Sequence, residues 1–218
     1  MKTFIRNNGL SIAFLILFLW SIAMQVHFGM QEFNTELSEN GAANVDLAEY
    51  LQSGHFFQST FENWESEFLQ MGLLVWMTIF LRQKGSSESK SLDKKDPVDR
   101  EPDPKKKDAP WPVKKGGIVL MVYEHSLTLV LFLIFIVSFL LHFYGSLRAE
   151  NLELALQGKP HETVVNYLGS SRFWFESFQN WQSEFLSVFA IIFLSIYLRQ
   201  KGSSQSKPVD APHDETGE

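Results

Sequence analysis

The sequence predicts an all-α membrane protein with four transmembrane helices, built from two tandem, parallel helix-pair repeats. The first observation is an internal duplication: residues 61–90 recur as residues 178–207, with roughly 17 of the 30 positions identical and no gap. The second is a pair of uncharged apolar runs, residues 10–26 and 126–143, which have about the length that a helix needs to cross a bilayer. The third is the uneven placement of basic residues along the chain, which assigns a side of the membrane to each segment.

Two further apolar runs, residues 68–81 and 185–198, are shorter, and by length alone they suit a buried core helix equally well. Extended back to Trp64 and Trp181, each run reaches about 18 residues, or ~27 Å of helix at 1.5 Å per residue. The two tryptophans then lie where aromatic residues gather at a membrane surface. We therefore expect both runs to cross.

Basic residues indicate which side of the membrane each segment faces. Residues 27–67 contain no lysine or arginine, whereas the chain between the second and third apolar runs is rich in both. Because cytoplasmic segments carry the excess of Lys and Arg, we expect both termini and the central segment to be cytoplasmic. If the two short runs failed to cross, the basic central segment would lie outside, so four spans is the better interpretation.

Four segments follow from this organisation. The first repeat comprises residues 1–84 and the second residues 116–201, each with two transmembrane helices and an outer segment. Residues 85–115 are rich in Lys, Asp, Ser and Pro, so we expect a flexible cytoplasmic linker, and residues 202–218 are expected to be a disordered tail. The N-terminus imitates a secretory signal, but its correspondence with the internal third run favours a retained anchor.

Short helices are expected in the two outer segments. Asp46 and Glu49 have the spacing of a capping box for a helix over residues 45–51, and Thr163 can cap a helix over residues 164–168. Aromatic clusters follow both segments. Such short amphipathic helices commonly lie in the membrane interface, and packing on top of the spanning helices is an equal alternative.

Polar residues at the outer ends of the second and fourth helices form the first candidate site, a polar or ion-binding site. Asn63 and Glu67 lie one helical turn apart on a shared face, and the duplicate supplies Asn180 and Glu184 in the same arrangement. Two-fold pseudo-symmetry would bring the two carboxylates and the two amides together.

Two histidines complete this candidate site, because His27 matches His142 in the segments HFGM and HFYG. Oxygen and imidazole ligands of this kind suit a divalent metal or a proton relay. The simpler interpretation is that acidic residues in the first helical turn complement the helix dipole, by about 0.3–1 kcal/mol each. One detail argues against it: two other glutamates of the first copy become glutamine in the second, whereas Glu67 is matched by Glu184.

The segment LRQKGSS-SK, which follows the second and fourth helices, is the second candidate site. Its residues are Arg82, Gln83, Lys84, Gly85, Arg199, Gln200, Lys201 and Gly202. Positive-inside anchoring and a glycine stop just after the helix explain the Arg, Lys and Gly, but not the identical glutamines or the paired serines. Exposed main-chain amides beside a lysine could hold a phosphate or a lipid headgroup, although anchoring alone is favoured. The spacing is not that of a P-loop.

The segments NWESEFLQ, SGHF and KGSSESK resemble those of a bacterial family of small four-span membrane proteins classed as a domain of unknown function. The resemblance covers nearly the whole chain, and the combination of NWESEF with KGSxESK is specific. The second half departs from it, with Gln182 and Gln205 where the first half has Glu65 and Glu88, which makes these glutamines weaker candidates. The resemblance implies a fold and a membrane location but no activity.

Nothing in the sequence supports enzymatic activity. The chain has no cysteine, no Ser/His/Asp set and no HExxH motif, and we expect no cofactor, no catalytic site and no assigned metal. The expected partners are the lipid bilayer and a second copy or another membrane protein, not nucleic acid. We expect a multi-pass protein of the bacterial inner membrane that acts through helix packing or partner contacts. The alternative is a small ion- or proton-linked transporter or channel that uses the duplicated Asn/Glu pairs.

Overall fold

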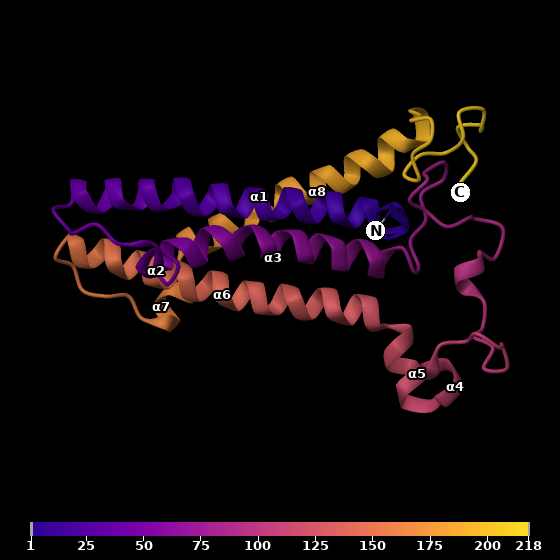
Figure 1. Ribbon diagram of the computed structural model, residues 1–218, viewed down its shortest axis with the longest axis horizontal. Coiled ribbons are helices and arrows are strands. Elements are labelled where there is room, and N and C mark those ends of the chain that lie inside the picture. The colour runs from indigo at the N-terminus through magenta and orange to yellow at the C-terminus, as the bar shows by residue number, and fades with distance from the viewer. Residues whose placement is uncertain (1, 218) are drawn as a thin grey trace. The chain divides into compact units, whose positions relative to one another are not determined.

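The computed structural model describes residues 2–217, so that residues 1 and 218, the extreme ends of the predicted first repeat and tail, lie outside the described residues. All regular elements within residues 2–217 are helical, as expected, and Figure 1 labels them in chain order. They are α1 (Lys2–Glu39), α2 (Leu47–Tyr50), α3 (Gly54–Met77), the 3-10 helix η1 (Pro97–Asp99), α4 (Trp111–Lys115), α5 (Gly117–Glu124), α6 (Ser126–Leu156), α7 (Val164–Leu168) and α8 (Ser171–Tyr197).

Helices α1 and α6 are each long and apolar enough to cross a membrane. Their large apolar side chains lie mostly on the outside of the protein, as Phe14 and Leu133 illustrate at 65% and 60% exposed. Helices α3 and α8 have 24 and 27 residues, or about 36 and 40 Å of helix, which is also sufficient length. In both helices a first half that contains glutamate, asparagine and serine as well as aromatic residues precedes the apolar residues.

The chain forms two compact units, whose boundaries fall inside α3, α6 and α8. The first unit comprises residues 1–61 and 140–173. Its core is formed by Phe33 and Leu37 of α1 packed against Tyr50 of α2. The predicted capping box is present, since Asp46 accepts from the Glu49 N–H at 2.9 Å and Glu49 accepts from the Asp46 N–H at 2.9 Å. This cap fixes the start of α2 and holds Tyr50 in the core.

Two buried tyrosines show how the short helices pack in the first unit. The Tyr50 hydroxyl lies against Gly29 of α1, where any side chain would collide with it. The Tyr167 hydroxyl of α7 makes a hydrogen bond of 2.6 Å with the Ser146 hydroxyl of α6. The pairs Tyr50/Tyr167 and Gly29/Ser146 are both separated by 117 residues, the same offset as the duplicated segment. The two copies therefore keep one register here, and both short helices pack on longer helices.

Helices α3 and α6 approach closely in the first unit because both present glycine at the contact. A Cβ atom on Gly54 would lie 2.5 Å from the Ala149 nitrogen and 2.7 Å from the Gly145 oxygen. A Cβ atom on Gly145 would lie 2.6 Å from Cβ of Phe57. Real side chains do not approach so closely, so this backbone-to-backbone contact requires glycine on both helices.

The second unit comprises residues 62–139 and 174–218. Here Phe132 of α6 packs 3.5 Å from the position that a side chain on Gly72 of α3 would take. The loop after α3 and the chain after α8 both belong to this unit, and in Figure 1 the yellow C-terminal segment lies beside the loop that follows α3. The hydrogen bonds of these two segments are described below.

Candidate functional site

Helices α3 and α8 form a polar cluster in the second unit. The side-chain amide of Asn180, a predicted site residue, donates a hydrogen bond to the Glu62 carboxylate. The indole N–H of Trp181 donates to Oε1 of Glu65 at 2.9 Å. Glu65 is completely buried, so its carboxylate needs hydrogen-bond donors from the protein rather than from water, and Trp181 is one of them.

The two glutamates singled out by the duplication also lie together. The side chains of Glu67 and Glu184 lie close enough to interact. Asn63 is exposed, and its backbone oxygen accepts from the Ser66 hydroxyl at 2.8 Å. The structure thus places Asn180 against Glu62, and Glu67 beside Glu184.

The histidines do not form the expected symmetric pair. His142 is completely buried, with its ring centre 5.1 Å from that of Phe173. His27 is exposed on α1, and its Nε2 lies 3.3 Å from the Gln31 amide nitrogen. In the 117-residue register set by the tyrosines, the counterpart of His142 is Gln25, because the HFGM and HFYG segments are offset by 115 residues. The amide of Gln25 donates to the Thr60 hydroxyl at 3.0 Å within the first unit.

Glu62 and Glu65 are the site residues that sequence reasoning missed. Their position near the start of a helix suggested a role in balancing the helix dipole, which requires no partner. A signal was nevertheless present, because Glu65 shares one helical face with Phe61 and Phe68, at spacings of four and three residues. A carboxylate on an apolar face needs a donor when it is buried, and Trp181 supplies it.

The second candidate site is a pair of matching turns, residues 82–90 and 199–207, which we call the serine turns. In the first, the Gln83 N–H donates to the Ser89 hydroxyl at 2.9 Å and the Glu88 N–H to the Ser86 hydroxyl at 3.1 Å. The second repeats both bonds, from the Gln200 N–H to Ser206 at 2.9 Å and from the Gln205 N–H to Ser203 at 3.1 Å.

These bonds explain the paired serines, which membrane anchoring did not. Each turn also contains a glycine with positive φ, 87° at Gly85 and 86° at Gly202, a conformation that glycine adopts without strain. Because the serine hydroxyls occupy main-chain amides of Gln83 and Glu88, these amides are not available to the phosphate considered from the sequence.

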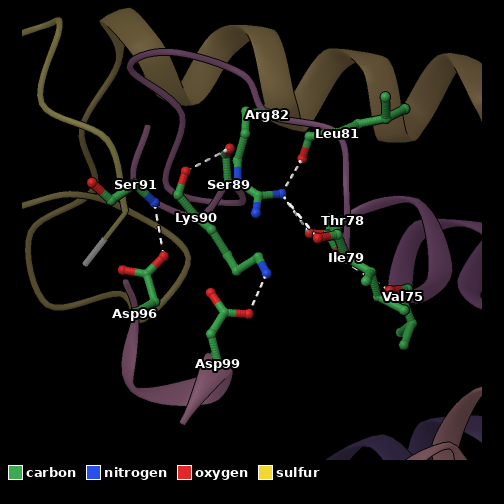
Figure 2. Close-up of polar contacts among 10 residues, drawn as sticks. All are labelled: Val75, Thr78, Ile79, Leu81, Arg82, Ser89, Lys90, Ser91, Asp96 and Asp99. Atoms are coloured by element: carbon green, nitrogen blue, oxygen red, sulfur yellow. Dashed lines mark hydrogen bonds and ion pairs between the residues drawn. The ribbon is translucent and has the colours of Figure 1, made fainter. Parts of the chain in front are cut away.

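Arginine, and not glycine, closes the helix that precedes each serine turn. Helix α3 ends at Met77, so Gly85 lies too far along the chain to be the glycine that stops it, which corrects that expectation. Nη1 of Arg82 instead donates to carbonyl oxygens of the turn that directly follows α3, as Figure 2 shows. The acceptors are Thr78 at 3.2 Å, Ile79 at 3.2 Å and Leu81 at 3.0 Å. Nη1 of Arg199 repeats the pattern with Ser195 at 3.2 Å, Ile196 at 3.1 Å and Leu198 at 2.9 Å. Both cations therefore satisfy carbonyls at the negative end of a helix dipole.

The lysines that end the two serine turns have different partners. Nζ of Lys90 forms an ion pair of 2.5 Å with Asp99, shown in Figure 2, and this hydrogen bond holds the pKa of Asp99 below its usual value. Nζ of Lys207 donates to the carbonyl oxygens of Pro212, His213 and Glu215, at 3.1, 3.0 and 2.8 Å. Lys207 is only 2% exposed beneath the thin cover of the tail, and desolvation, with the Arg199 charge, lowers its pKa.

The C-terminal tail also contacts the first serine turn within the second unit. The Gly85 N–H donates to the Thr216 hydroxyl at 2.8 Å, and the Gly217 N–H donates to the main-chain carbonyl oxygen of Ser86 at 3.1 Å. The buried hydroxyls of Ser86 and Ser195 lie 3.0 Å apart. Lys84 is exposed and lies 3.8 Å from an Asp214 carboxylate oxygen, and Lys201 is also exposed.

The first serine turn contains the segment KGSSESK, one of those that carried the resemblance to a known family. A family model shows which family this is. The model described as Domain of unknown function (DUF6766) matches residues 1–218. The chain belongs to this family. Comparison with curated proteins and with solved structures gives no significant match. Membership in the DUF6766 family confirms the expected relationship to an uncharacterised domain and assigns no activity.

Proposed function

We propose that this member of the DUF6766 family is a multi-pass integral membrane protein of the bacterial inner membrane that acts without catalysis. In this proposal α1, α3, α6 and α8 all cross, and the serine turns and both termini face the cytoplasm. The protein would act through contacts of its helices with a second copy or with another membrane protein.

The observation that carries the proposal is the pairing of each serine turn with an exposed apolar helix. On α8, Leu186 and Phe189 are 59% and 61% exposed, and on α3 Trp76 is 46% exposed. Water-soluble proteins rarely expose such patches, whereas lipid solvates them well. Directly after each of these helices, Arg82 and Arg199 close the last turn with a positive charge, as expected at a cytoplasmic membrane surface.

Reporter fusions test this topology. Alkaline phosphatase, which is active only outside the cytoplasm, would be joined after Gly41, after residue 90, after Gly158 and after residue 207. We expect activity after Gly41 and Gly158 and none after the other two. Activity after residue 90 would mean that α3 does not cross, and the four-span proposal would then be wrong.

Partner contacts are tested separately, by photo-crosslinking in native membranes. A photoreactive side chain would replace Phe193, which is 45% exposed on α8, and a control would replace Ser204 in the exposed part of the second serine turn. We expect one defined crosslinked species from Phe193 and none from Ser204. Crosslinks to lipid alone at Phe193 would contradict a partner on this face.

A second function, ion- or proton-linked transport, is favoured by one observation, the closeness of the Glu67 and Glu184 side chains. Two neighbouring carboxyl groups can relay a proton, because one can accept the proton that the other releases. The test is proton and sodium flux in liposomes for the parent, the Glu67→Gln/Glu184→Gln double variant and the control Glu39→Gln at the exposed end of α1. Transport predicts flux in the parent and the control and none in the double variant. No flux in the parent would exclude this function.

A further inference from the structure

An apolar groove of about 540 Å³ lies between α3 and α8 in the second unit. Leu73, Leu74 and Met77 line it from α3, and Val188, Phe189 and Ile192 line it from α8. Its volume lies within the roughly 300–1,000 Å³ of small-molecule sites. The first serine turn contributes polar residues to the lining, among them Arg82, Gln83 and Ser89. The groove therefore has the amphipathic character of a lipid, with an apolar length and a polar, cationic end.

Arg82 differs from its duplicate in a way that bears on this groove. Both arginines use Nη1 to close their helix, but Arg199 also donates from Nε to the Pro208 oxygen at 3.2 Å and from Nη2 to the Ala211 oxygen at 3.0 Å. Within residues 2–217, Nε and Nη2 of Arg82 have no hydrogen-bond acceptor. The tail thus occupies this edge of the guanidinium in the second copy, while the chain after the first serine turn leaves it open.

The open edge of Arg82 has the geometry that recognises phosphate. Nε–H and Nη2–H of an arginine point in parallel, and this fork matches two oxygens of one phosphate group. Two carboxylates are near this end of the groove, Glu88 in its lining and Asp99 in reach of the Arg82 charge. Asp99 is held by Lys90 and Asp214 lies beside Lys84, so the donors that remain for an anion at this end of the groove are those of the open Arg82 edge.

We propose that the groove binds one anionic phospholipid, with its phosphate on the Nε/Nη2 edge of Arg82 and an acyl chain between α3 and α8. This proposal rests on the membrane location proposed above, which brings phospholipid to the groove. The duplicated arginine does not form a second site, because the tail carbonyls already occupy the same edge of Arg199. The site is therefore one per chain despite the duplication.

The test is lipid retention by the purified, delipidated full-length protein in detergent, measured by native mass spectrometry. Phosphatidylglycerol and phosphatidylcholine with identical acyl chains would be added in turn, so that only the headgroup charge differs. We expect one tightly bound phosphatidylglycerol per chain and weaker binding of phosphatidylcholine. Arg82→Gln should lower the affinity for phosphatidylglycerol about tenfold, as expected for loss of a charge-assisted pair, and should remove the preference. The matched control Arg199→Gln should leave both unchanged.

Two further measurements keep the test decisive if Arg82→Gln perturbs the fold. Val188→Trp fills the apolar part of the groove without touching Arg82, and it should abolish binding of both lipids while the circular dichroism spectrum stays unchanged. Glycerol 3-phosphate, which has the anion but no acyl chain, should not compete at equal concentration. Equal retention of both lipids by the parent, or unchanged retention in Val188→Trp, would overturn the proposal. The fusion experiment fails or succeeds independently, because lipid binding here is measured in detergent.

Discussion

Lys207 provides the sharpest test of the tail structure, because its duplicate Lys90 is a built-in control. The perturbation is Lys207→Met, which keeps the length of the side chain and removes the ammonium group. Nζ of Lys207 donates to three tail carbonyls at 2.8–3.1 Å and is shielded from water at 2% exposure. A hydrogen bond from a charged donor contributes about 1.5–3 kcal/mol to stability. When the tail opens, water hydrates the ammonium group and offsets part of what the three bonds contribute. We therefore expect opening of the tail to become easier by about 1.5–3 kcal/mol.

The assay is hydrogen exchange of the tail amides in detergent at neutral pH. The Gly217 N–H, which donates to the Ser86 oxygen at 3.1 Å, reports directly on opening. Its exchange should accelerate roughly 10- to 150-fold in Lys207→Met, since each 1.4 kcal/mol corresponds to a factor of ten. Lys90→Met removes only a solvent-accessible ion pair with Asp99 and should change this exchange little. Equal acceleration in both variants, or none in Lys207→Met, would refute the assigned contacts.

Three further predictions concern the first unit. Burial lowers the pKa of His55, so near pH 6.5 and just below it the unfolded state binds more protons than the folded state. Stability should therefore fall as the pH drops below about 6.5, and His55→Phe should flatten this dependence in thermal melts. Gly145→Val should destabilise by about 1–3 kcal/mol or more in the same melts, whereas Gly9→Val, with open space around it, should be nearly neutral; similar shifts would refute the close helix contact. Tyr167→Phe should cost about 0.5–1.5 kcal/mol through loss of the Ser146 hydrogen bond, and an unchanged melting temperature would argue against that bond.

Local chemistry and the duplication made part of this structure predictable. The capping box of Asp46 and Glu49 depends on residues three apart, so the sequence predicts it directly. The contact between Glu67 and Glu184 follows from the duplication, which matches one glutamate with the other. The all-helical fold of the described residues and two membrane-length apolar helices are confirmed. The number of spans, the orientation and the transport alternative stay predictions.

The remaining features depend on contacts that periodicity does not encode. The match of His27 with His142 uses an offset of 115 residues, whereas the duplicated segments are offset by 117 residues. Only a few identical residues surround the histidines, so the sequence does not fix the alignment there. Gly85 was expected to stop α3, but the Arg82 side chain satisfies the last carbonyls and leaves glycine to the following turn. The partners of Lys207 lie in the tail, which has no counterpart in the first repeat, so the duplication gave no guide to them.

The measurement that tests the membrane topology most directly is single-cysteine labelling of the intact protein in whole cells. The natural chain has no cysteine, so each introduced thiol is the only reactive one. Lys94→Cys and Ser204→Cys follow α3 and α8, whereas Asn40→Cys and Lys159→Cys follow α1 and α6, and all four positions are exposed. A membrane-impermeant maleimide should label positions 40 and 159 on intact cells and positions 94 and 204 only after the membrane is opened. Labelling of position 94 or 204 on intact cells would contradict the crossing of α3 and α8.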